Sequence, residues 1–296
     1  MQNQIPEFLI NLLLKQYGQD ITDKIIEGYR AQREVTLRVN TIKSSVNEIK
    51  QILSENKIEF EEITWNENAL IIKNTTEQEL RDLDIYEQGK IYLQSLSSMI
   101  PSIILEPKEG ENILDMAAAP GGKTTQMAAL ANNKCMITAC EKNKIRAERL
   151  KYNLQKQGVG CVNVMLEDAR NLSDFFAFDK ILLDAPCSGS GTENVNTKYF
   201  TEELIKKSSK TQEQLLNKAL KVLKPGNEMI YSTCSILEQE NENILKQVLQ
   251  KFNAEIVPIE ISKDIPLLPV SINGTICVCP TKNYEGFFIA KIRKNK

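Results

Sequence analysis

The sequence contains no histidine, and this absence excludes several kinds of site. Neither a Ser-His-Asp triad nor a Cys-His pair can form, and histidine cannot hold a metal ion. Neither sign of charge predominates, because 37 Lys and Arg residues against 39 Asp and Glu residues leave a net charge of −2. This balance argues weakly against nonspecific binding of polyanions, so a nucleic-acid partner would have to meet a local basic surface.

Long apolar runs are missing too, since none reaches the length of about 18 residues that a membrane-spanning helix needs. The first residues, MQNQIPEF, lack a basic segment followed by an apolar core, so we expect no secretion signal. The seven cysteines form an odd count with scattered spacing, which argues against a disulfide framework and for a reducing compartment. We therefore expect a soluble, cytoplasmic protein. We also expect no metal site, because Cys277 and Cys279 have no matching second pair.

The most informative stretch that is present is NILDMAAAPGGKTTQMAAL, residues 112–130. Residues 113–116 have the length and composition of a buried strand, and a helix is expected to begin near Lys123. The residues between them have almost no side-chain bulk, so a ligand could lie against their backbone. These residues are Ala117, Ala118, Ala119, Pro120, Gly121 and Gly122. A tight turn without a ligand is the alternative.

Three ligand classes compete for this loop. A phosphate-binding P-loop requires G-x-x-x-x-G-K-[ST], and the stretch supplies Gly122, Lys123 and Thr124. It places Ala117 where the first glycine belongs, so the match is partial. The dinucleotide pattern G-x-G-x-x-G fails because Gly121 and Gly122 are adjacent and no third glycine follows. The third interpretation is the S-adenosyl-L-methionine site of a Rossmann-like methyltransferase, in which such a loop holds a nucleoside.

Alternating strands and helices from residue 112 onward predict a mainly parallel sheet with helices on both faces. The expected strands are residues 113–116, 136–140, 162–165, 180–183 and 228–232, with 287–291 as a last edge strand. The fold class is therefore α/β, with a Rossmann-like sheet after a small α+β domain. We expect N-terminal helices in residues 1–33, the small domain in 34–90 and the sheet domain in 91–296. The pattern of residues 34–90 leaves open whether this module is a structural cap or a nucleic-acid platform.

Polar residues that follow the predicted strands should meet at one edge of the sheet, where ligands of open α/β sheets bind. Glu141 follows the second strand and is placed to accept hydrogen bonds from ribose hydroxyls. Asp168 follows the third strand, where a carboxylate can accept from an adenine amino group. Either acid could instead cap the next helix, and both alternatives stay open.

Two cysteines follow the fourth and fifth predicted strands, in ILLDAPCSGSG (Cys187) and IYSTCSI (Cys234). A lone buried cysteine is usually a small hydrophobic residue, but two thiols at neighbouring strand ends beside a cofactor loop favour chemistry. C5 of cytosine cannot attack a methyl sulfonium until a thiolate adds to C6, and the thiol pair fits that need. Asp184 is the candidate acid near N3, and a base must later remove the C5 proton.

Eight motifs in this order resemble the NOL1/NOP2/Sun family of RNA cytosine-5 methyltransferases, over nearly the whole chain. They are LRVNTIK (37–43), QSLSSMIP (94–101), DMAAAPGGKTTQ (115–126), DAPCSGSGT (184–192), LKPG (223–226), YSTCSI (231–236), ENE (240–242) and GFFIAK (286–291). The resemblance implies that residues 117–123, Glu141, Asp168 and Asp184 contact S-adenosyl-L-methionine or its surroundings. It also implies that the small N-terminal domain resembles an RNA-recognition fold.

The resemblance also implies roles for the two thiols. DNA cytosine-5 methyltransferases carry the nucleophile in the proline-cysteine pair, here Cys187, whereas the RNA family uses the threonine-cysteine pair, here Cys234. Cys234 is therefore the expected nucleophile, and Cys187 is expected to assist release of the product. The triplet Glu193, Asn194 and Val195, which also occurs in DNA enzymes, lies directly after the Cys187 motif and is interpreted as coincidence. The loop 191–201 is short for the family.

We therefore expect a monomeric RNA methyltransferase that forms 5-methylcytosine in rRNA or tRNA, without a metal or a membrane partner. With histidine absent, backbone dipoles or lysines such as Lys123 would have to lower the pKa of the catalytic thiol. Arg146 is a candidate for contact with the cofactor or with RNA phosphate. The other candidate phosphate contacts are Arg38, Lys43, Lys206, Lys207 and Lys210. An idle assembly factor that binds RNA and a P-loop nucleotide hydrolase remain as alternatives.

Overall fold

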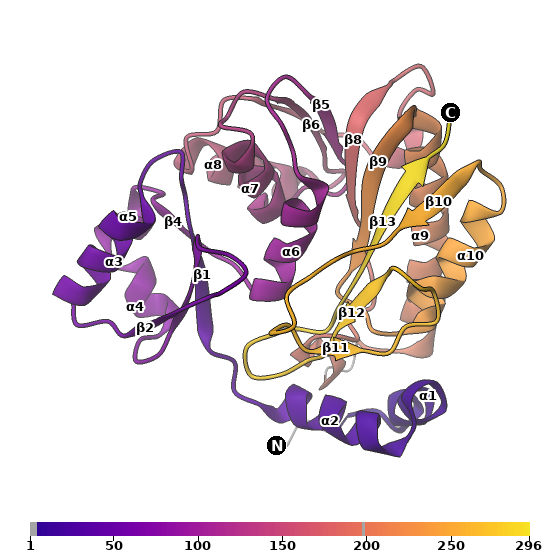
Figure 1. Ribbon diagram of the computed structural model, residues 1–296, viewed down its shortest axis with the longest axis horizontal. Helices are drawn as coiled ribbons and strands as arrows, with labels where there is room; N and C mark the ends of the chain where they lie inside the picture. Colours follow the sequence, from indigo (N-terminus) through magenta and orange to yellow (C-terminus); the bar gives the residue numbers. More distant parts are fainter. Residues whose placement is uncertain (1–4, 197–198) are drawn as a thin grey trace.

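Two β-sheets organise the computed structural model, which describes residues 5–196 and 199–296 (Figure 1). The smaller, four-stranded sheet has the order β2-β3-β1-β4 and forms a lobe at one side of the molecule. The larger, nine-stranded sheet has the order β11-β12-β13-β9-β8-β5-β6-β7, with β10 paired to β13. Residues 1–4 lie outside the described residues, and they include the start of the segment in which we expect no secretion signal. Residues 197 and 198, in the loop 191–201, also lie outside the described residues.

The parallel half of the larger sheet agrees with the predicted α/β order. Its strands are β5 (Asn112–Asp115), β6 (Met136–Cys140), β7 (Val162–Met165), β8 (Phe178–Asp184) and β9 (Leu223–Thr233). The helices that accompany it are α6 (Leu96–Leu105), α7 (Gly122–Leu130), α8 (Lys144–Lys156), α9 (Glu202–Val222) and α10 (Glu242–Leu249). Because both faces are covered, the middle residues of the central strands are apolar, and Ile113, Leu114 and Leu182 are fully buried.

The C-terminal strand β13 (Phe287–Lys294) lies inside the larger sheet, so the prediction of an edge strand at residues 287–291 is wrong. It pairs antiparallel with β9 on one side, with Ala290 opposite Tyr231. On its other side it pairs with β12 (Ile276–Val278) and with β10 (Ala254–Val257), and β11 (Leu267–Leu268) continues the sheet beyond β12. The run FFIA is buried throughout, which is typical of an interior strand.

The smaller sheet consists of β1 (Val35–Val39), β2 (Phe60–Glu62), β3 (Ala69–Ile72) and β4 (Ile91–Leu93). The helices α3 (Val46–Glu55), α4 (Glu77–Arg81) and α5 (Asp84–Glu87) accompany it. Leu37 of β1 and Ile49 and Leu53 of α3 are fully buried in one core, because α3 turns its apolar side to the sheet. Strand β4 pairs with β1, so this sheet continues to Leu93, beyond the domain boundary expected at residue 90.

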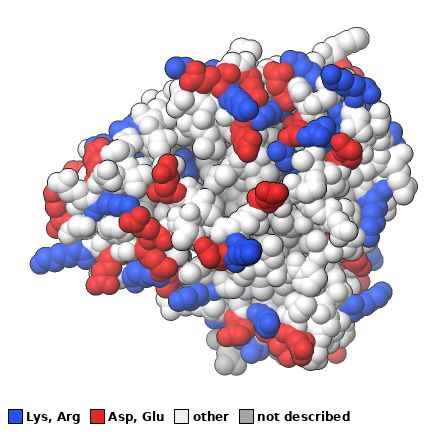
Figure 2. Space-filling view, in the orientation of Figure 1, with Lys and Arg blue, Asp and Glu red and all other residues white. Residues whose placement is uncertain are grey.

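The first two helices, α1 (Glu7–Tyr17) and α2 (Gln19–Arg30), pack against the larger sheet. Leu9, Leu13 and Ile25 are fully buried in the same core as Phe288 of β13. None of the helices in the described ranges is long and apolar enough to cross a membrane. On the face shown in Figure 2, basic and acidic side chains are interspersed, which agrees with the near-zero net charge.

Candidate active site

The loop between β5 and α7 has the close packing that its small residues predict. The amide of Ala118 donates to the carbonyl of Cys140 at 3.0 Å, which ties the loop to the end of β6. Gly121 precedes α7 with φ of 109°, and a Cβ at this position would lie 2.9 Å from Cδ1 of Leu150 in α8. Glycine is therefore required at residue 121 by its backbone conformation and by its neighbour.

Asp115, at the end of β5, holds this loop against α7. Its Oδ2 accepts a hydrogen bond from the Thr124 hydroxyl at 2.7 Å, and its Oδ1 lies 3.4 Å from the donating amide of Ala117. The side chain is 1% exposed, and burial raises the pKa of Asp115 to about 6. Sequence reasoning did not single out this residue, although an acid that ends a buried strand was a signal.

A pocket beside the loop brings together residues from several strand ends. Its lining includes Met116 and Ala117 from the loop, Glu141 and Arg146 after β6, Asp168 after β7 and Pro186 after β8. It thus unites four residues that the sequence singled out separately. The other expected loop residues lie farther along the loop or in the first turn of α7, outside this lining. These are Ala118, Ala119, Pro120, Gly121, Gly122 and Lys123.

Glu141 and Arg146 form a unit at this pocket. The Glu141 side chain is almost fully buried, and its Oε1 accepts from the amide of Asn143 at 2.8 Å. Arg146 lies 3.3 Å from the other carboxylate oxygen and donates to the carbonyl of Ala119 at 2.7 Å. Asn143, rather than Glu141, caps α8, so Glu141 does not have the capping role that was its alternative.

Asp168 does have the capping role, because it caps the short helix that begins at Ala169. Arg170 donates to both oxygens of the Asp168 carboxylate, at 3.0 Å and 2.7 Å. These hydrogen bonds hold the pKa of Asp168 below its usual range. Sequence reasoning missed Arg170, and a basic residue two positions after a strand-end acid was the only local signal.

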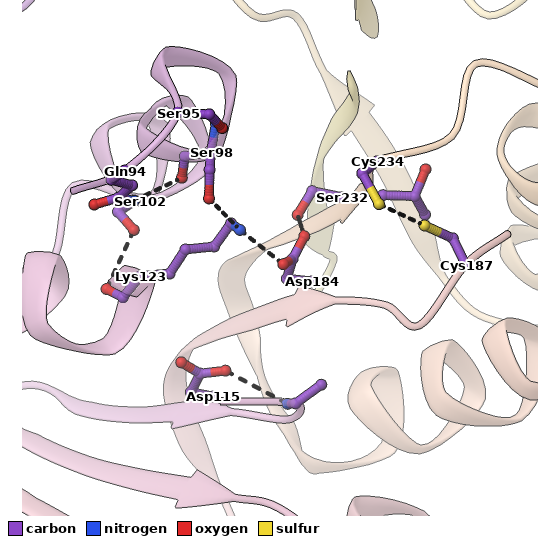
Figure 3. Close-up of polar contacts among 12 residues, drawn as sticks. Gln94, Ser95, Ser98, Ser102, Asp115, Lys123, Asp184, Cys187, Ser232 and Cys234 are labelled. Atoms are coloured by element: carbon purple, nitrogen blue, oxygen red, sulfur yellow. Dashed lines mark hydrogen bonds and ion pairs between the residues drawn. The ribbon is translucent and has the colours of Figure 1, made fainter. Parts of the chain in front are cut away.

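Lys123 and Asp184 form a second polar group, which lies between α6, α7 and β8 (Figure 3). The Lys123 ammonium donates to Asp184 Oδ2 and to the hydroxyl of Ser98, both at 2.7 Å. The hydroxyl of Ser232 donates to the other Asp184 oxygen at 2.8 Å. Lys123, one of the groups expected to lower the pKa of the catalytic thiol, thus has Asp184 and Ser98 as its hydrogen-bond partners.

The structure brings the two strand-end thiols together. The sulfur atoms of Cys187 and Cys234 lie 3.0 Å apart, and both cysteines are free (Figure 3). The hydrogen bond to Cys234 and burial raise the pKa of Cys187 well above the usual value. Cys187 therefore stays protonated and can donate to the sulfur of Cys234.

Two of the candidate phosphate contacts have other partners. Arg38 is 3% exposed and donates to Gln94 at 3.0 Å and to Thr125 at 2.9 Å, which contradicts its expected contact with RNA phosphate. The ammonium of Lys43 donates to the carbonyls of Gln88 and Lys156. Lys206 and Lys210 line a groove of about 710 Å³ between α1, α9 and α10. Throughout the described ranges, no cluster of three or more Cys, Asp or Glu is placed to hold a metal ion.

Two family models match the chain. The model described as 16S rRNA methyltransferase RsmB/F matches residues 102–293. The model described as RsmF/B-like, ferredoxin-like domain matches residues 5–78, which fits the predicted small α+β domain. Together they cover β1, β2 and β3 of the smaller sheet and nearly all of the larger one, but not β4.

Individual relatives are similar over most of this chain. It is 38% identical over 273 residues to the tRNA (cytosine(49)-C(5))-methyltransferase of Pyrococcus abyssi, which covers 88% of each chain. It is 36% identical over 271 residues to the ribosomal RNA small subunit methyltransferase F of Shewanella piezotolerans, but covers only 57% of that relative. The crystal structure of NSun6 from Pyrococcus horikoshii with SFG has a TM-score of 0.89 at 26% identity and covers 98% of both chains.

Proposed function

Because the chain belongs to the RsmB/F family of 16S rRNA methyltransferases, the NOL1/NOP2/Sun family that its motifs resemble, we propose that it methylates C5 of cytosine in RNA. The substrate is rRNA or tRNA, as the names of the two relatives suggest. The observation that carries the proposal is the 3.0 Å contact between Cys187 and Cys234. Methylation of an exocyclic amine needs no thiol, whereas methylation of C5 needs a nucleophile for C6.

The pocket beside the β5–α7 loop fits S-adenosyl-L-methionine as the methyl donor. The side chain of Ala117 leaves the loop backbone open to a ligand, and the buried Glu141 carboxylate is placed for ribose hydroxyls. Oδ1 of Asp168 accepts two hydrogen bonds from Arg170, but Oδ2 accepts only one from it and keeps a second lone pair that can accept from an adenine amino group. The relative whose crystal structure contains SFG, an analogue of the donor, supports the assignment.

The chain's own residues supply the covalent chemistry. When bound, S-adenosyl-L-methionine supplies an electrophilic methyl group. The Cys234 thiolate adds to C6 of cytosine, which makes C5 nucleophilic. Asp184 is the candidate acid for N3, and because both of its oxygens accept hydrogen bonds it must first take up a proton before it can donate one. After the methyl group is on C5, a base takes the C5 proton, the C6–sulfur bond breaks and Cys234 leaves as thiolate. Cys187 assists this release, since its sulfur is 3.0 Å from the leaving sulfur.

The protein acts as a cytoplasmic monomer without a bound metal or a membrane partner.

The target cytosine leaves its stack to reach the thiols, so single-stranded or loop cytosines are favoured. Bisulfite sequencing of total RNA from cells with and without the protein identifies the modified position. A position that stays methylated in cells without the protein is not its target.

The two thiols have opposite phenotypes when each is removed. Cys187→Ala should let a covalent protein–RNA adduct accumulate, because release is impaired, whereas Cys234→Ala should abolish both adduct and product. The measurement is a denaturing gel of protein incubated with RNA and S-adenosyl-L-methionine, with methyl incorporation counted in parallel. Cys161→Ala is the control, because its sulfur contacts Cys135 at 3.8 Å and lies outside the cleft. If the Cys234→Ala variant forms the adduct and the Cys187→Ala variant does not, Cys187 is the nucleophile and Cys234 assists release.

A catalytically idle RNA-binding factor and a P-loop hydrolase are the rival functions. Titration of the pure protein with S-adenosyl-L-methionine and with ATP separates them, read out by heat of binding. We expect S-adenosyl-L-methionine to bind and ATP to bind at least about tenfold more weakly. Tight binding of ATP alone would refute the methyltransferase proposal, and donor binding without methyl incorporation into any cellular RNA would favour the idle factor.

A further inference from the structure

The ENE motif, residues 240–242, lies at a break between two helical segments. Sequence periodicity predicts one helix over residues 238–252, but a short helix (Glu238–Glu240) ends before α10 begins at Glu242. Asn241 lies between them with φ of −126° and ψ of −95°, outside the helical range. Glu240 and Asn241 are fully buried. The break directs both side chains toward the loops that carry the two thiols.

The Glu240 carboxylate joins these two loops. Its Oε1 accepts from the amide of Ser188, the residue after Cys187, at 2.7 Å. Its Oε2 accepts from the hydroxyl of Ser235, the residue after Cys234, at 2.7 Å. The hydroxyl of Ser188 also donates to this carboxylate. One buried group thus contacts the residue that follows each reactive cysteine.

Two amides complete the arrangement. Asn241 accepts from the hydroxyl of Thr233 at 2.6 Å and donates to the carbonyl of Ser235 at 2.9 Å, so it holds the segment around Cys234 from both sides. Gln212 of α9, also fully buried, donates to the carbonyl of Pro186 at 2.9 Å and to Glu240 at 3.3 Å. The segment around Cys187 is thus held on both sides as well.

We propose that Glu240 and Asn241 are positioning residues that form a buried polar clamp and fix the two thiols against each other. Their use in catalysis rests on the proposed methyl transfer, but the clamp itself does not. A displacement of about 1 Å at a reacting group can cost about 100-fold in rate, so a fixed sulfur–sulfur distance matters. The negative charge of Glu240 also helps to raise the pKa of Cys187 and thereby keeps it protonated.

The catalytic test compares two substitutions of one residue. Glu240→Ala removes both ends of the bridge, and we expect kcat to fall about 100-fold. The KM values for S-adenosyl-L-methionine and RNA should stay within about threefold, because Glu240 is not among the residues that line the cofactor pocket. Glu240→Gln keeps an acceptor for the Ser188 amide while the serine hydroxyls rotate, so most of kcat should return. Glu242→Gln is the matched control, since Glu242 instead accepts from the amide of Ser271.

A second test needs no methyl transfer. Iodoacetamide alkylation of the unliganded protein is followed against pH, and mass spectrometry locates the modified cysteine. In the wild-type protein, Cys234 should be alkylated well before Cys187. In Glu240→Ala this order of alkylation should be lost. In Glu240→Gln the pH dependence of Cys187 alkylation should move to lower pH. Circular dichroism shows whether each variant is folded. If Glu240→Ala does not fold, the pH dependence of Cys187 alkylation in Glu240→Gln tests the clamp instead.

The outcomes separate the two proposals. Wild-type protein that methylates no RNA would refute the proposed function, while the alkylation order still reports on the clamp. An alkylation order and pH profile that are the same in wild type and in both Glu240 variants would overturn the clamp. So would a Glu240→Ala variant whose kcat stays within about threefold of wild type.

Discussion

Asp115 keeps its proton to a higher pH than an exposed aspartate, because it is buried at the end of β5. Its pKa rises from 3.8 to about 6 in the folded protein. Between these values the folded state binds more protons than the unfolded state, so the contribution of Asp115 to stability falls as pH rises. Above the pKa that Asp115 has in the folded protein, this contribution to stability is fully lost and no longer changes with pH.

The Asp115→Asn variant should reveal this loss, since an asparagine does not titrate. The free energy of unfolding of Asp115→Asn minus that of wild type should rise by about 2.5 kcal/mol between pH 3.8 and pH 7, as a pKa shift of about two units implies. Urea unfolding at several pH values measures this rise, and titrating groups that do not interact with Asp115 cancel in the difference; its charged neighbours are Asp184 and Lys123. A difference that does not change with pH would contradict the raised pKa.

Single residues of the site were predictable wherever chemistry and a strand end coincide. Glu141, Asp184, Cys187 and Cys234 all follow apolar runs, and the sheet brings them to one edge. Their partners were not predictable, because hydrogen bonds such as that from Lys123 to Ser98 join residues that are far apart in sequence. The sequence places an acid or a thiol, but packing decides what it contacts.

The helix α7 depends on Gly121, which precedes its first residue. Gly121→Ala should place a side chain in a left-handed conformation and against Leu150, and thereby displace the β5–α7 loop. We expect affinity for S-adenosyl-L-methionine to fall about tenfold, which corresponds to about 1.4 kcal/mol. Calorimetric titration measures the change.

Gly110→Ala is the matched control for this prediction. Gly110 also has positive φ, at 80°, but a Cβ there would meet no atom within 4 Å. Its substitution should cost stability of about 1–2 kcal/mol through the backbone alone and leave cofactor affinity unchanged. Equal cofactor affinities in the two variants would mean that the loop does not depend on Gly121.

Strand β13 shows why one element was misplaced. Its residues were identified correctly, but its position depends on β10, β11 and β12, which are short and carry little periodicity. Without these strands an FFIA run after the last helix is expected at the edge. The burial of both of its faces indicates an interior strand only once covering elements are known.

Across the whole molecule, the two sheets are joined by a buried cation. Arg38 of β1 donates to Thr125 in α7, so the small domain contacts the helix that follows the β5–α7 loop. Asn40 adds a hydrogen bond at 2.8 Å to the carbonyl of Gln157, after α8, and a second at 2.8 Å within the small domain, to the carbonyl of Gly89. The LRVN motif, expected in an RNA-recognition module, therefore connects the small domain to the rest of the protein.

Arg38→Lys should weaken this connection, because an ammonium cannot reproduce the planar geometry of a guanidinium. We expect the free energy of unfolding to fall by about 1–3 kcal/mol, with earlier proteolysis within residues 34–93, since buried polar partners lose their donor. Lys43→Met is the comparison, and it should cost less because Lys43 is exposed. Equal losses in both variants would argue against a special role for the buried cation.

The interior position of β13 has a consequence for the protein during synthesis. Strand β9 ends next to Cys234, but its neighbour on one side is residues 287–294. While the ribosome still holds those residues, β9 is an open edge and its thiol loop lacks its finished support. A nascent chain therefore completes the surroundings of Cys234 only after residues 287–294 have emerged.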